Sequence, residues 1–277
     1  MISVIIPTRN RYSYVKLLIQ DVHKQELNET YELIVVDQST NPEHLEDCKH
    51  IITATTGPCF SRNLAVKSAI GNVLVFLDDD ARIGSNFLEE ITRPILKEEF
   101  SAVSGAVCDP EGKYLKTEKD YLTQENTNFI KILTANPNHD KSRVGLCLPA
   151  GCCAILKDVF LELGGFDETF DPTGAGEDRE LSVRLFKAGY PIWYNSNAKL
   201  LHAIAAKGGS RDIDSRSMML DVHSYRICKM HFSETLANEL RGTILRTYKK
   251  RFFNSILSFK FVKTRYYMYQ KVKRLMD

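Results

Sequence analysis

The chain has 277 residues, of which 43% are hydrophobic and 26% are charged, enough apolar content for one large domain or two closely joined halves. It has no run of 18 or more apolar residues, which excludes a membrane-spanning helix, and its first residues lack the basic segment of a signal peptide. Seven cysteines without such a signal favour a reducing cytosol and structural thiols.

Strand-like and helix-like patterns alternate along the first hundred residues. Buried-type strands are predicted at 3–7, 33–37 and 73–77, because each is a short hydrophobic run bounded by polar or turn residues. Pro7 should stop the first strand, since proline has no N–H for a central position in a sheet. Ser61 should cap the helix that precedes the third strand. The alternation predicts βαβ units and a parallel sheet.

The second half of the chain has a more mixed pattern. Strands are predicted at 103–107, 144–148 and 153–156, the polar stretch 110–145 should be rich in loops, and a helix is predicted at 177–188. Trp193 and Tyr194 follow that helix. They are candidates for a sugar-stacking wall, although such residues are more typical of a core.

Three adjacent carboxylates, Asp78, Asp79 and Asp80, directly follow the hydrophobic strand at 73–77. Burying such a cluster without a cation is costly, because like charges oppose one another's ionisation and resist the loss of water. A divalent ion removes that cost, and Mg²⁺ or Mn²⁺ prefers carboxylate oxygens together with substrate phosphates. The run therefore predicts a metal–diphosphate site. The alternative is an acidic loop that leaves a core strand.

Polar residues also follow the other two strands predicted in the first half. Pro7-Thr8-Arg9-Asn10 comes at the end of the first strand, and Asp37-Gln38-Ser39 at the end of the second. Because the carboxyl ends of parallel strands meet at one edge of a sheet, we expect these segments and the acidic run to line a single crevice.

Several further motifs occur in a fixed order along the chain. They are Gly57-Pro58-Cys59-Phe60-Ser61-Arg62-Asn63, Gly164-Gly165-Phe166-Asp167-Glu168, Gly174-Ala175-Gly176-Glu177-Asp178-Arg179-Glu180-Leu181, and Gly189-Tyr190 followed by His202. Together with the strand ends, this set resembles the inverting family-2 glycosyltransferases of the GT-A fold over roughly residues 1–205. The resemblance is specific because it requires several motifs in order, whereas any one of them alone would be weak.

The resemblance implies an α/β protein of the GT-A fold, with three α/β/α layers around a mostly parallel central sheet. Residues 1–105 would form the nucleotide-sugar-binding half of one domain, and residues 106–215 its acceptor-binding half. The implied activity is metal-dependent transfer, with inversion, of a sugar from a nucleoside-diphosphate donor to a hydroxyl of a glycan or lipid-linked acceptor. Such a reaction belongs to polysaccharide or glycoconjugate synthesis, and UDP is the favoured donor nucleotide.

The same resemblance assigns donor binding to the strand ends, the second helix and the acidic run. The residues concerned are Pro7, Thr8, Arg9, Asp37, Arg62, Asn63, Asp78 and Asp79. Asp37 matches a base-reading aspartate, whose carboxylate can accept a hydrogen bond from N3–H of uracil or thymine. Guanine also offers an N–H donor, so Asp37 supports a pyrimidine without proving one. Arg62 would otherwise be a solvated surface residue, and Asp79 would either contact the donor sugar or face away.

Metal binding is assigned to the two ends of an Asp-x-Asp motif, Asp78 and Asp80, with Asp80 holding the ion that bridges both phosphates. His202 aligns with a histidine that supplies an additional metal ligand in many relatives. A neutral imidazole suits Mn²⁺ better than Mg²⁺, so either ion is a candidate and Mn²⁺ fits this ligand better. The alternative for His202 is a loop histidine that binds no metal.

Glu177 and Asp178 open a helix after a glycine-rich turn. A helix N-terminus favours negative charge, so a carboxylate at that position can accept a proton as a general base. The resemblance assigns the base to Asp178 and orientation of the acceptor to Glu177. Thr173, Gly174 and Gly176 would let the acceptor approach the backbone closely. The alternative is a pair of first-turn acids that only stabilise the helix.

The C-terminal residues 216–277 are basic and aromatic. They contain 14 Lys and Arg against 4 Asp and Glu, a net of +10, whereas residues 1–215 contain 23 against 31, a net of −8. Segments such as Lys249-Lys250-Arg251-Phe252-Phe253 and the neighbouring Phe259 and Phe261 predict a helical extension that contacts anionic lipid. The protein would then be cytoplasmic and peripheral at the inner face of the cell membrane. Packing of this extension on the body, or on a second subunit in a homodimer, is the alternative. Nucleic acid is not an expected partner, because no nucleic-acid-binding motif accompanies the tail.

Two other functions compete with glycosyl transfer. A sugar nucleotidyltransferase would also use an α/β sheet and Mg²⁺, but it should carry a glycine-rich phosphate loop with Arg or Lys directly after the first strand, where this chain has Pro7-Thr8-Arg9-Asn10. A non-catalytic carbohydrate-binding protein of the same fold is the second alternative. The presence of Asp78, Asp80 and Asp178 argues against it.

Overall fold

The computed structural model describes residues 1–114, 138–203, 208–209, 216–258 and 260–277. The chain forms two compact units, Met1–Asp212 and Ile213–Asp277. Most of the stretch predicted to be rich in loops, residues 115–137, lies outside the described part, as does Phe259.

The N-terminal unit is built on one mixed sheet. Its strands in the described residues are β1 (Ile2–Thr8), β2 (Tyr31–Asp37), β3 (Lys49–Ile52), β4 (Val73–Leu77), β5 (Ala81–Ile83), β6 (Ala102–Cys108), β7 (Arg143–Gly145), β8 (Cys152–Leu156) and β9 (Ile192–His202). They are ordered β3-β2-β1-β4-β8-β6-β9-β5, and β7 pairs with β9. Because β6 runs through the boundary predicted at 105/106, the two proposed halves share a strand of the same sheet.

The direction of the strands changes in the middle of the sheet. β3, β2, β1 and β4 are mutually parallel, as the alternating pattern predicted. β8 then runs antiparallel to both of its neighbours, β4 and β6. β9 is parallel to β6 and antiparallel to β5 and β7. A fully buried hydrophobic run carries no signal for direction, so the sequence could not distinguish β8 from a parallel strand.

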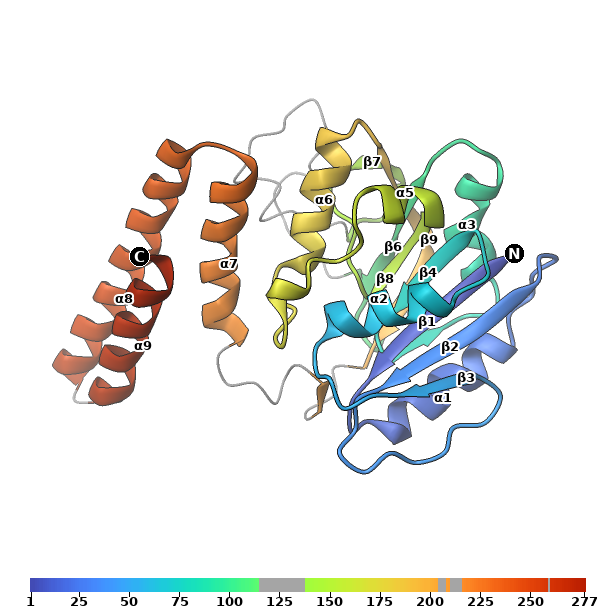
Figure 1. Ribbon diagram of the computed structural model, residues 1–277, viewed down its shortest axis with the longest axis horizontal. Helices are drawn as coiled ribbons and strands as arrows, with labels where there is room; N and C mark the ends of the chain where they lie inside the picture. Colours follow the sequence, from blue (N-terminus) through green and yellow to red (C-terminus); the bar gives the residue numbers. More distant parts are fainter. Residues whose placement is uncertain (115–137, 204–207, 210–215, 259) are drawn as a thin grey trace. The chain divides into compact units, whose positions relative to one another are not determined.

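Helices cover both faces of this sheet and produce the predicted three layers (Figure 1). They are α1 (Tyr12–His23), α2 (Pro58–Ser68), α3 (Phe87–Leu96), α5 (Lys157–Glu162) and α6 (Glu177–Lys187). On one face, Val15 and Leu18 of α1 and Leu88 of α3 join the main hydrophobic core. On the other face, Phe76 of β4 packs against Phe160 of α5, with ring centroids 5.4 Å apart.

Three local expectations are corrected by the structure. Pro7 does not end β1, because the pairing of β1 with β4 stops at Ile5 while the pairing with β2 continues to Thr8. Proline therefore lies where only one neighbour is paired. Ser61 is inside α2 rather than at its cap, since the helix begins at Pro58, a residue suited to a first helical position. The strand predicted at 144–148 is the shorter β7.

Several residues that drew attention in the sequence belong to the interior. Tyr194 is fully buried in β9, and Trp193 stacks on Phe100 with centroids 5.1 Å apart, so neither forms an open sugar-stacking wall. All seven cysteines are thiols rather than halves of a disulfide. Burial raises the pKa of the Cys147 thiol to about 12, which keeps it protonated and unreactive at neutral pH.

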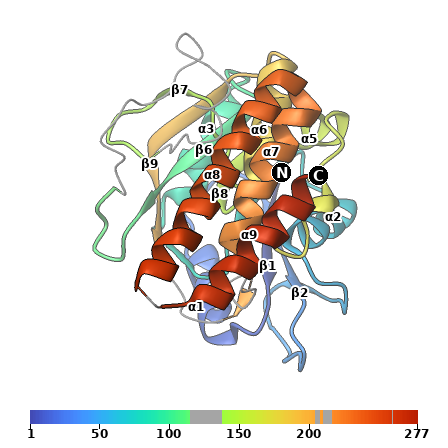
Figure 2. The same cartoon turned by 90° about the vertical axis from the view of Figure 1, so that its left-hand side faces the viewer.

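The C-terminal unit consists of three helices that lie side by side, α7 (Arg216–His231), α8 (Glu234–Ser258) and α9 (Val262–Met276), as Figure 2 shows. Its own hydrophobic core is formed by Met218, Val222, Ile244, Tyr248, Val272 and Met276. The Tyr248 hydroxyl donates a hydrogen bond to Asp221 of α7 at 2.9 Å. None of the helices in the described part of the chain combines the length and the apolar character needed to cross a membrane.

Candidate active site

The acidic run lies between β4 and β5, at the carboxyl edge of the parallel strands. Asp80 is almost fully buried, and Asp78 is the more exposed of the two. β5 pairs with the end of β9, which sets Ala81 opposite His202. The His202 Nε2 atom is consequently 3.2 Å from Asp80 Oδ1.

Asp78, Asp80 and His202 form one cluster suited to a divalent cation. Each contributes a ligand atom, and these atoms all lie within 4.8 Å of one another. Two carboxylate oxygens and an imidazole nitrogen are a set of ligand atoms that fits Mn²⁺. Mg²⁺ also binds carboxylate oxygens, but it has less preference for an imidazole nitrogen. The structure thus brings together the three residues predicted as metal ligands, although His202 is more than 120 positions away from the two aspartates in the sequence.

The middle carboxylate of the run, Asp79, faces the protein interior. Its two oxygens accept hydrogen bonds from the Thr8 hydroxyl at 2.8 Å and from Arg11 Nη1 at 2.7 Å. Burial raises the pKa of Asp79 to about 6, against the opposing effect of Arg11. Both Asp79 oxygens are thus engaged by protein groups, and its role toward the donor stays a prediction. Thr8, predicted to bind the base and ribose, uses its hydroxyl in this contact.

Arg11 is a site residue that sequence reasoning missed. Its guanidinium lies 3.4 Å from Asp80 as well as 2.7 Å from Asp79, and it donates to the Gly208 carbonyl at 2.8 Å. Burial alone lowers the pKa of Arg11, but the nearby carboxylates outweigh burial and raise it. Gly208 has φ of +82°, and a Cβ there would lie 2.7 Å from Arg11 Cγ. Arg11 thus neutralises part of the acidic run and binds the Gly208 carbonyl.

Replacing Arg11 with Gln should destabilise the protein strongly, because it leaves Asp79 buried without its cation. Removing one partner of a buried ion pair typically costs about 3–5 kcal/mol. Urea unfolding in EDTA measures the loss. The matched control is Lys16→Gln, whose ion pair with Glu43 at 2.8 Å is exposed and should contribute less than about 1 kcal/mol. Equal losses for the two variants would contradict a structural role for the Arg11 pair.

Arg62 connects the acidic run with the start of α6. It is buried in α2, where Nη2 lies 2.9 Å from Asp78 Oδ1 and Nη1 lies 3.2 Å from Glu177 Oε1. Burial lowers the pKa of Arg62, but Asp78 and Glu177 outweigh that effect and leave it raised. Arg62 is therefore not a solvated surface residue, and its part in donor binding stays a prediction. Its Nε atom has no hydrogen-bond partner among the residues that the structure describes.

The two acids proposed for catalysis begin α6. Glu177 is mostly buried beside Arg62, whereas Asp178 is partly exposed and accepts a hydrogen bond from the Arg179 N–H at 2.8 Å. The glycine-rich turn before them serves packing. Gly174 has φ of +59°, and a Cβ there would lie 2.2 Å from Pro58 at the start of α2. Gly174 therefore lets α2 approach this turn, which is a use that the sequence did not indicate.

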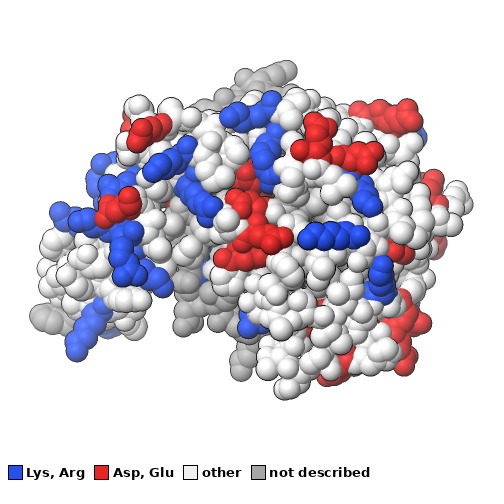
Figure 3. Space-filling model, viewed as in Figure 1, with Lys and Arg blue, Asp and Glu red and all other residues white. Residues whose placement is uncertain are grey.

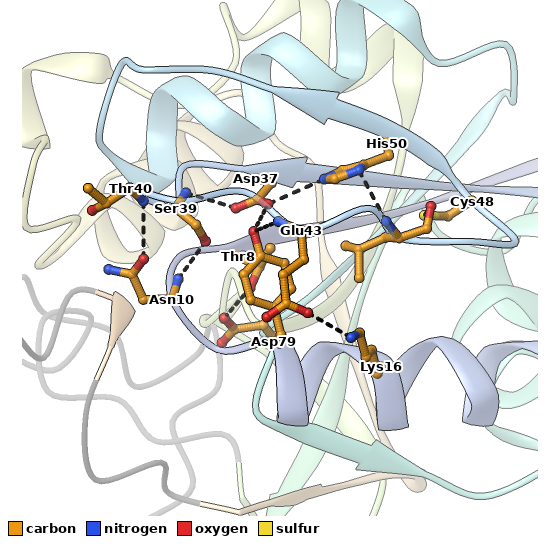
Figure 4. A network of polar contacts seen from close by, with 12 residues as sticks. Thr8, Asn10, Lys16, Asp37, Ser39, Thr40, Glu43, Cys48, His50 and Asp79 are labelled. Carbon is orange, nitrogen blue, oxygen red and sulfur yellow. Dashed lines mark hydrogen bonds and ion pairs between the residues drawn. The ribbon is translucent and has the colours of Figure 1, made fainter.

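Asp37, the predicted base reader, lies at the end of β2 in a polar network (Figure 4). It has no exposed surface, and it accepts hydrogen bonds from the Ser39 N–H at 2.8 Å and from the Tyr12 hydroxyl. His50 Nε2 is 3.3 Å from the same carboxylate. Both Asp37 oxygens are thus occupied by protein groups, which a sequence pattern alone could not reveal.

Three other predicted donor residues are spread around this edge of the sheet. Pro7 lies within β1. Arg9 follows this strand, and its buried Nε has no hydrogen-bond partner in the described part of the chain. Asn63 does not reach the acidic run. Its amide donates to the Phe166 carbonyl at 2.8 Å and accepts from the Phe166 N–H at 3.0 Å, so it fixes the turn before Glu168.

Gly151 is a second residue that the sequence did not single out. The Asp78 N–H donates to the Gly151 carbonyl at 3.2 Å, and a Cβ on Gly151 would lie 2.3 Å from Asp78 Oδ2. Only glycine leaves room for the Asp78 side chain in this position. The turn at the start of β8 therefore helps to orient a predicted metal ligand.

Comparison with known proteins agrees with this geometry. A family model described as glycosyl transferase family 2 matches residues 3–164. The O-antigen biosynthesis protein RfbC of Myxococcus xanthus is 25% identical over 246 residues, which cover 81% of this chain and 19% of RfbC. An uncharacterized glycosyltransferase of Haemophilus influenzae is 32% identical over 155 residues, covering 48% of this chain and 60% of that protein. The chain thus spans less than two thirds of the length of these relatives.

The fold is similar to that of two solved glycosyltransferases. GalNAc-T7, determined with UDP, GalNAc and Mn²⁺, gives a TM-score of 0.62 at 17% identity, over 83% of this chain and 47% of that one. S. aureus TarS 1–349 in complex with UDP-GlcNAc gives a TM-score of 0.60 at 17% identity, over 86% of this chain and 70% of that one. These likenesses confirm the predicted α/β architecture of the GT-A type. Because the family model covers more than half of its length, the chain belongs to glycosyl transferase family 2.

Proposed function

We propose that the chain is a metal-dependent, inverting glycosyltransferase that moves a sugar from a nucleoside-diphosphate donor to a hydroxyl acceptor. One observation carries the proposal. The group of Asp78, Asp80 and His202 is joined through buried Arg62 to Glu177, which begins α6 together with Asp178. One side chain thereby links the proposed diphosphate site to the first turn of α6, which carries the candidate general base.

Asp178 is the proposed general base. It is partly exposed at the N-terminus of α6, where the helix favours a negative charge. Asp178 takes the proton of the acceptor hydroxyl, that oxygen forms a bond with the anomeric carbon, and the bond from this carbon to the diphosphate oxygen breaks. Attack from the side opposite the leaving group inverts the configuration at the anomeric carbon.

The remaining side chains hold the reacting groups. Asp80, Asp78 and His202 would hold a divalent ion, which supplies charge neutralisation for the departing diphosphate. Glu177 keeps Arg62 in place and is proposed to orient the acceptor. Arg62 acts as a positioning residue, because it fixes Asp78 and Glu177 relative to each other.

UDP is the proposed donor nucleotide. The Tyr12 hydroxyl donates to Asp37, so an O–H already sits where the N3–H of uracil would bind this carboxylate. The structures that this fold resembles were determined with UDP or UDP-GlcNAc, which supports the same choice. Binding of the base would require Tyr12 to give up its contact with Asp37.

A glycan or a lipid-linked glycan is the proposed acceptor, in polysaccharide or glycoconjugate synthesis, and the similarity to an O-antigen biosynthesis protein supports this class. We further propose that the protein is cytoplasmic and meets the inner face of the cell membrane through residues 216–277. A homodimer through the same residues is the competing arrangement.

A panel of nucleotides tests the proposed function. Thermal unfolding is measured with UDP, dTDP, GDP and CMP, each with Mn²⁺ and each with EDTA, and donor hydrolysis is measured with UDP-GlcNAc and UDP-GalNAc. We expect UDP with Mn²⁺ to give the largest rise in unfolding temperature and one of the two donors to be hydrolysed slowly. A larger rise in unfolding temperature with GDP would overturn the choice of uracil as the nucleobase. Release of pyrophosphate from UTP and a sugar phosphate would identify a nucleotidyltransferase, and binding without any hydrolysis or transfer would favour the non-catalytic alternative.

A further inference from the structure

The end of α8 and the start of α9 expose large apolar side chains. Leu257 is 80% exposed, Phe261 73% and Tyr267 63%, and Phe253, Ile256 and Tyr266 are also exposed. Phe253, Ile256 and Leu257 stand at positions i, i+3 and i+4, so they share one face of α8. This face is separate from the core of the C-terminal unit, which Ile244 and Tyr248 of the same helix help to form.

Ring contacts connect α8 and α9 at this surface. The Phe252 ring lies 5.6 Å from Phe253 and 5.3 Å from Tyr266 of α9. The Lys249 ammonium lies 5.9 Å from the centre of the Phe253 ring. We call the surface formed by Phe253, Ile256, Leu257, Phe261, Tyr266 and Tyr267 the α8–α9 tip.

The charged residues next to the α8–α9 tip in the sequence are all basic. Between Glu239 and Asp277 the sequence contains no acidic residue. Lys249, Lys250, Arg251, Lys260 and Lys263 are all exposed close to the tip in sequence. Figure 3 shows that Lys and Arg side chains predominate over the C-terminal helices on the visible face.

A partner for this surface has to be apolar and anionic at once. A second copy of the chain would place two basic tips against each other, and this repulsion opposes a homodimer through the tip. An anionic lipid surface satisfies both requirements, because aromatic and aliphatic side chains enter the interface while Lys and Arg face the headgroups. We propose that the α8–α9 tip is a docking surface for anionic membranes. This refines the membrane contact proposed above and does not depend on the transfer reaction.

The two components of the surface predict two components of binding. Each Lys or Arg that reaches an anionic interface should strengthen binding about fivefold, and this part should weaken as salt rises. The apolar part should persist in salt, because salt screens charge but does not restore the water contact that burial removed. Full-length protein should therefore sediment with vesicles of phosphatidylcholine and phosphatidylglycerol more than with phosphatidylcholine alone.

Substitutions in the full chain are the appropriate test. A truncation near Thr243 would cut α8 in its middle and remove four of the six residues of the unit's core. Instead, the tip variant combines Leu257→Ser with Phe261→Asn. Phe261 has φ of +57°, which Asn tolerates better than most residues. The matched control is Leu161→Ser, which alters a leucine that is 54% exposed on α5. The charge variant combines Lys249→Gln, Lys250→Gln and Lys263→Gln, which removes positive charge and leaves the apolar side chains of the tip unchanged.

The tip variant should lower vesicle binding about tenfold or more at high salt, the charge variant should lower it mainly at low salt, and the control should bind as wild type does. All four proteins should unfold at the same temperature without vesicles and should respond equally to UDP with Mn²⁺. No binding of wild type to anionic vesicles at low salt would overturn the proposal. A lower unfolding temperature of the tip variant would indicate packing on the body, and a wild-type dimer that this variant dissociates would indicate self-association. The UDP response reports separately on the proposed enzyme function.

Discussion

Asp80→Asn should remove most of the metal-dependent affinity for UDP and leave the fold intact. Asp80 is about 1% exposed and lies between Arg11 and His202, at 3.4 and 3.2 Å, so its carboxylate is the most enclosed of the three proposed metal ligands. Loss of a residue that hydrogen-bonds a metal ligand typically lowers metal affinity 10–100-fold. Loss of a direct ligand should therefore lower it about 100-fold. Asn keeps the size of the side chain, and Arg11 retains Asp79 at 2.7 Å.

Calorimetry of UDP binding, with Mn²⁺ and with EDTA, measures this effect. The control is Asp158→Asn, the same chemical change at an exposed residue in the first turn of α5, which should bind UDP as wild type does. If wild type binds UDP as tightly in EDTA as in Mn²⁺, the assignment of Asp80 to a metal site is wrong. If both variants lose affinity, the effect comes from net charge and not from the ligand group.

Asp178→Asn should reduce turnover by roughly 10²–10⁴, the range typical of losing a general base. The substitution keeps the size of the side chain and removes its basicity. UDP affinity should change little, because Asp178 is not among the grouped Asp78, Asp80 and His202. Steady-state transfer and UDP calorimetry on the same preparation separate the two effects.

Glu177→Gln is the comparison variant, because it alters the neighbouring acid of the same helix turn. Glu177 is buried against Arg62, so its loss should lower stability and disturb Asp78 through Arg62, with effects on both UDP binding and turnover. If Asp178→Asn retains transfer within a few-fold of wild type, another residue is the base. Glu177 is then the first candidate.

The sequence by itself determined the local features of this protein. The hydrophobic run of β4, the carboxylates after it and the acids that begin α6 were all readable, because each is a pattern within about ten residues. The basic and helical character of residues 216–277 was readable for the same reason. Ordered motifs added the family, since their combination is far more specific than any one of them.

Only the tertiary structure decided how distant segments use those features. β8 enters the sheet antiparallel between β4 and β6, and its turn brings Gly151 against Asp78, which no local pattern signals. Arg11 looks like any helix-flanking arginine until the fold buries it beside Asp79. Asn63 fitted a donor motif, yet its amide holds the Phe166 backbone.

The C-terminal unit also shows what the sequence could determine and what only the folded chain decided. Sequence composition could not separate its aromatic residues into core and surface, because α7, α8 and α9 share a core whose members come from all three helices. Tyr248 is buried there, whereas Phe253, five positions later on the same helix, is exposed. Periodicity within a segment reports the faces of a single helix or strand, but which face becomes covered depends on partners that only the folded chain brings together.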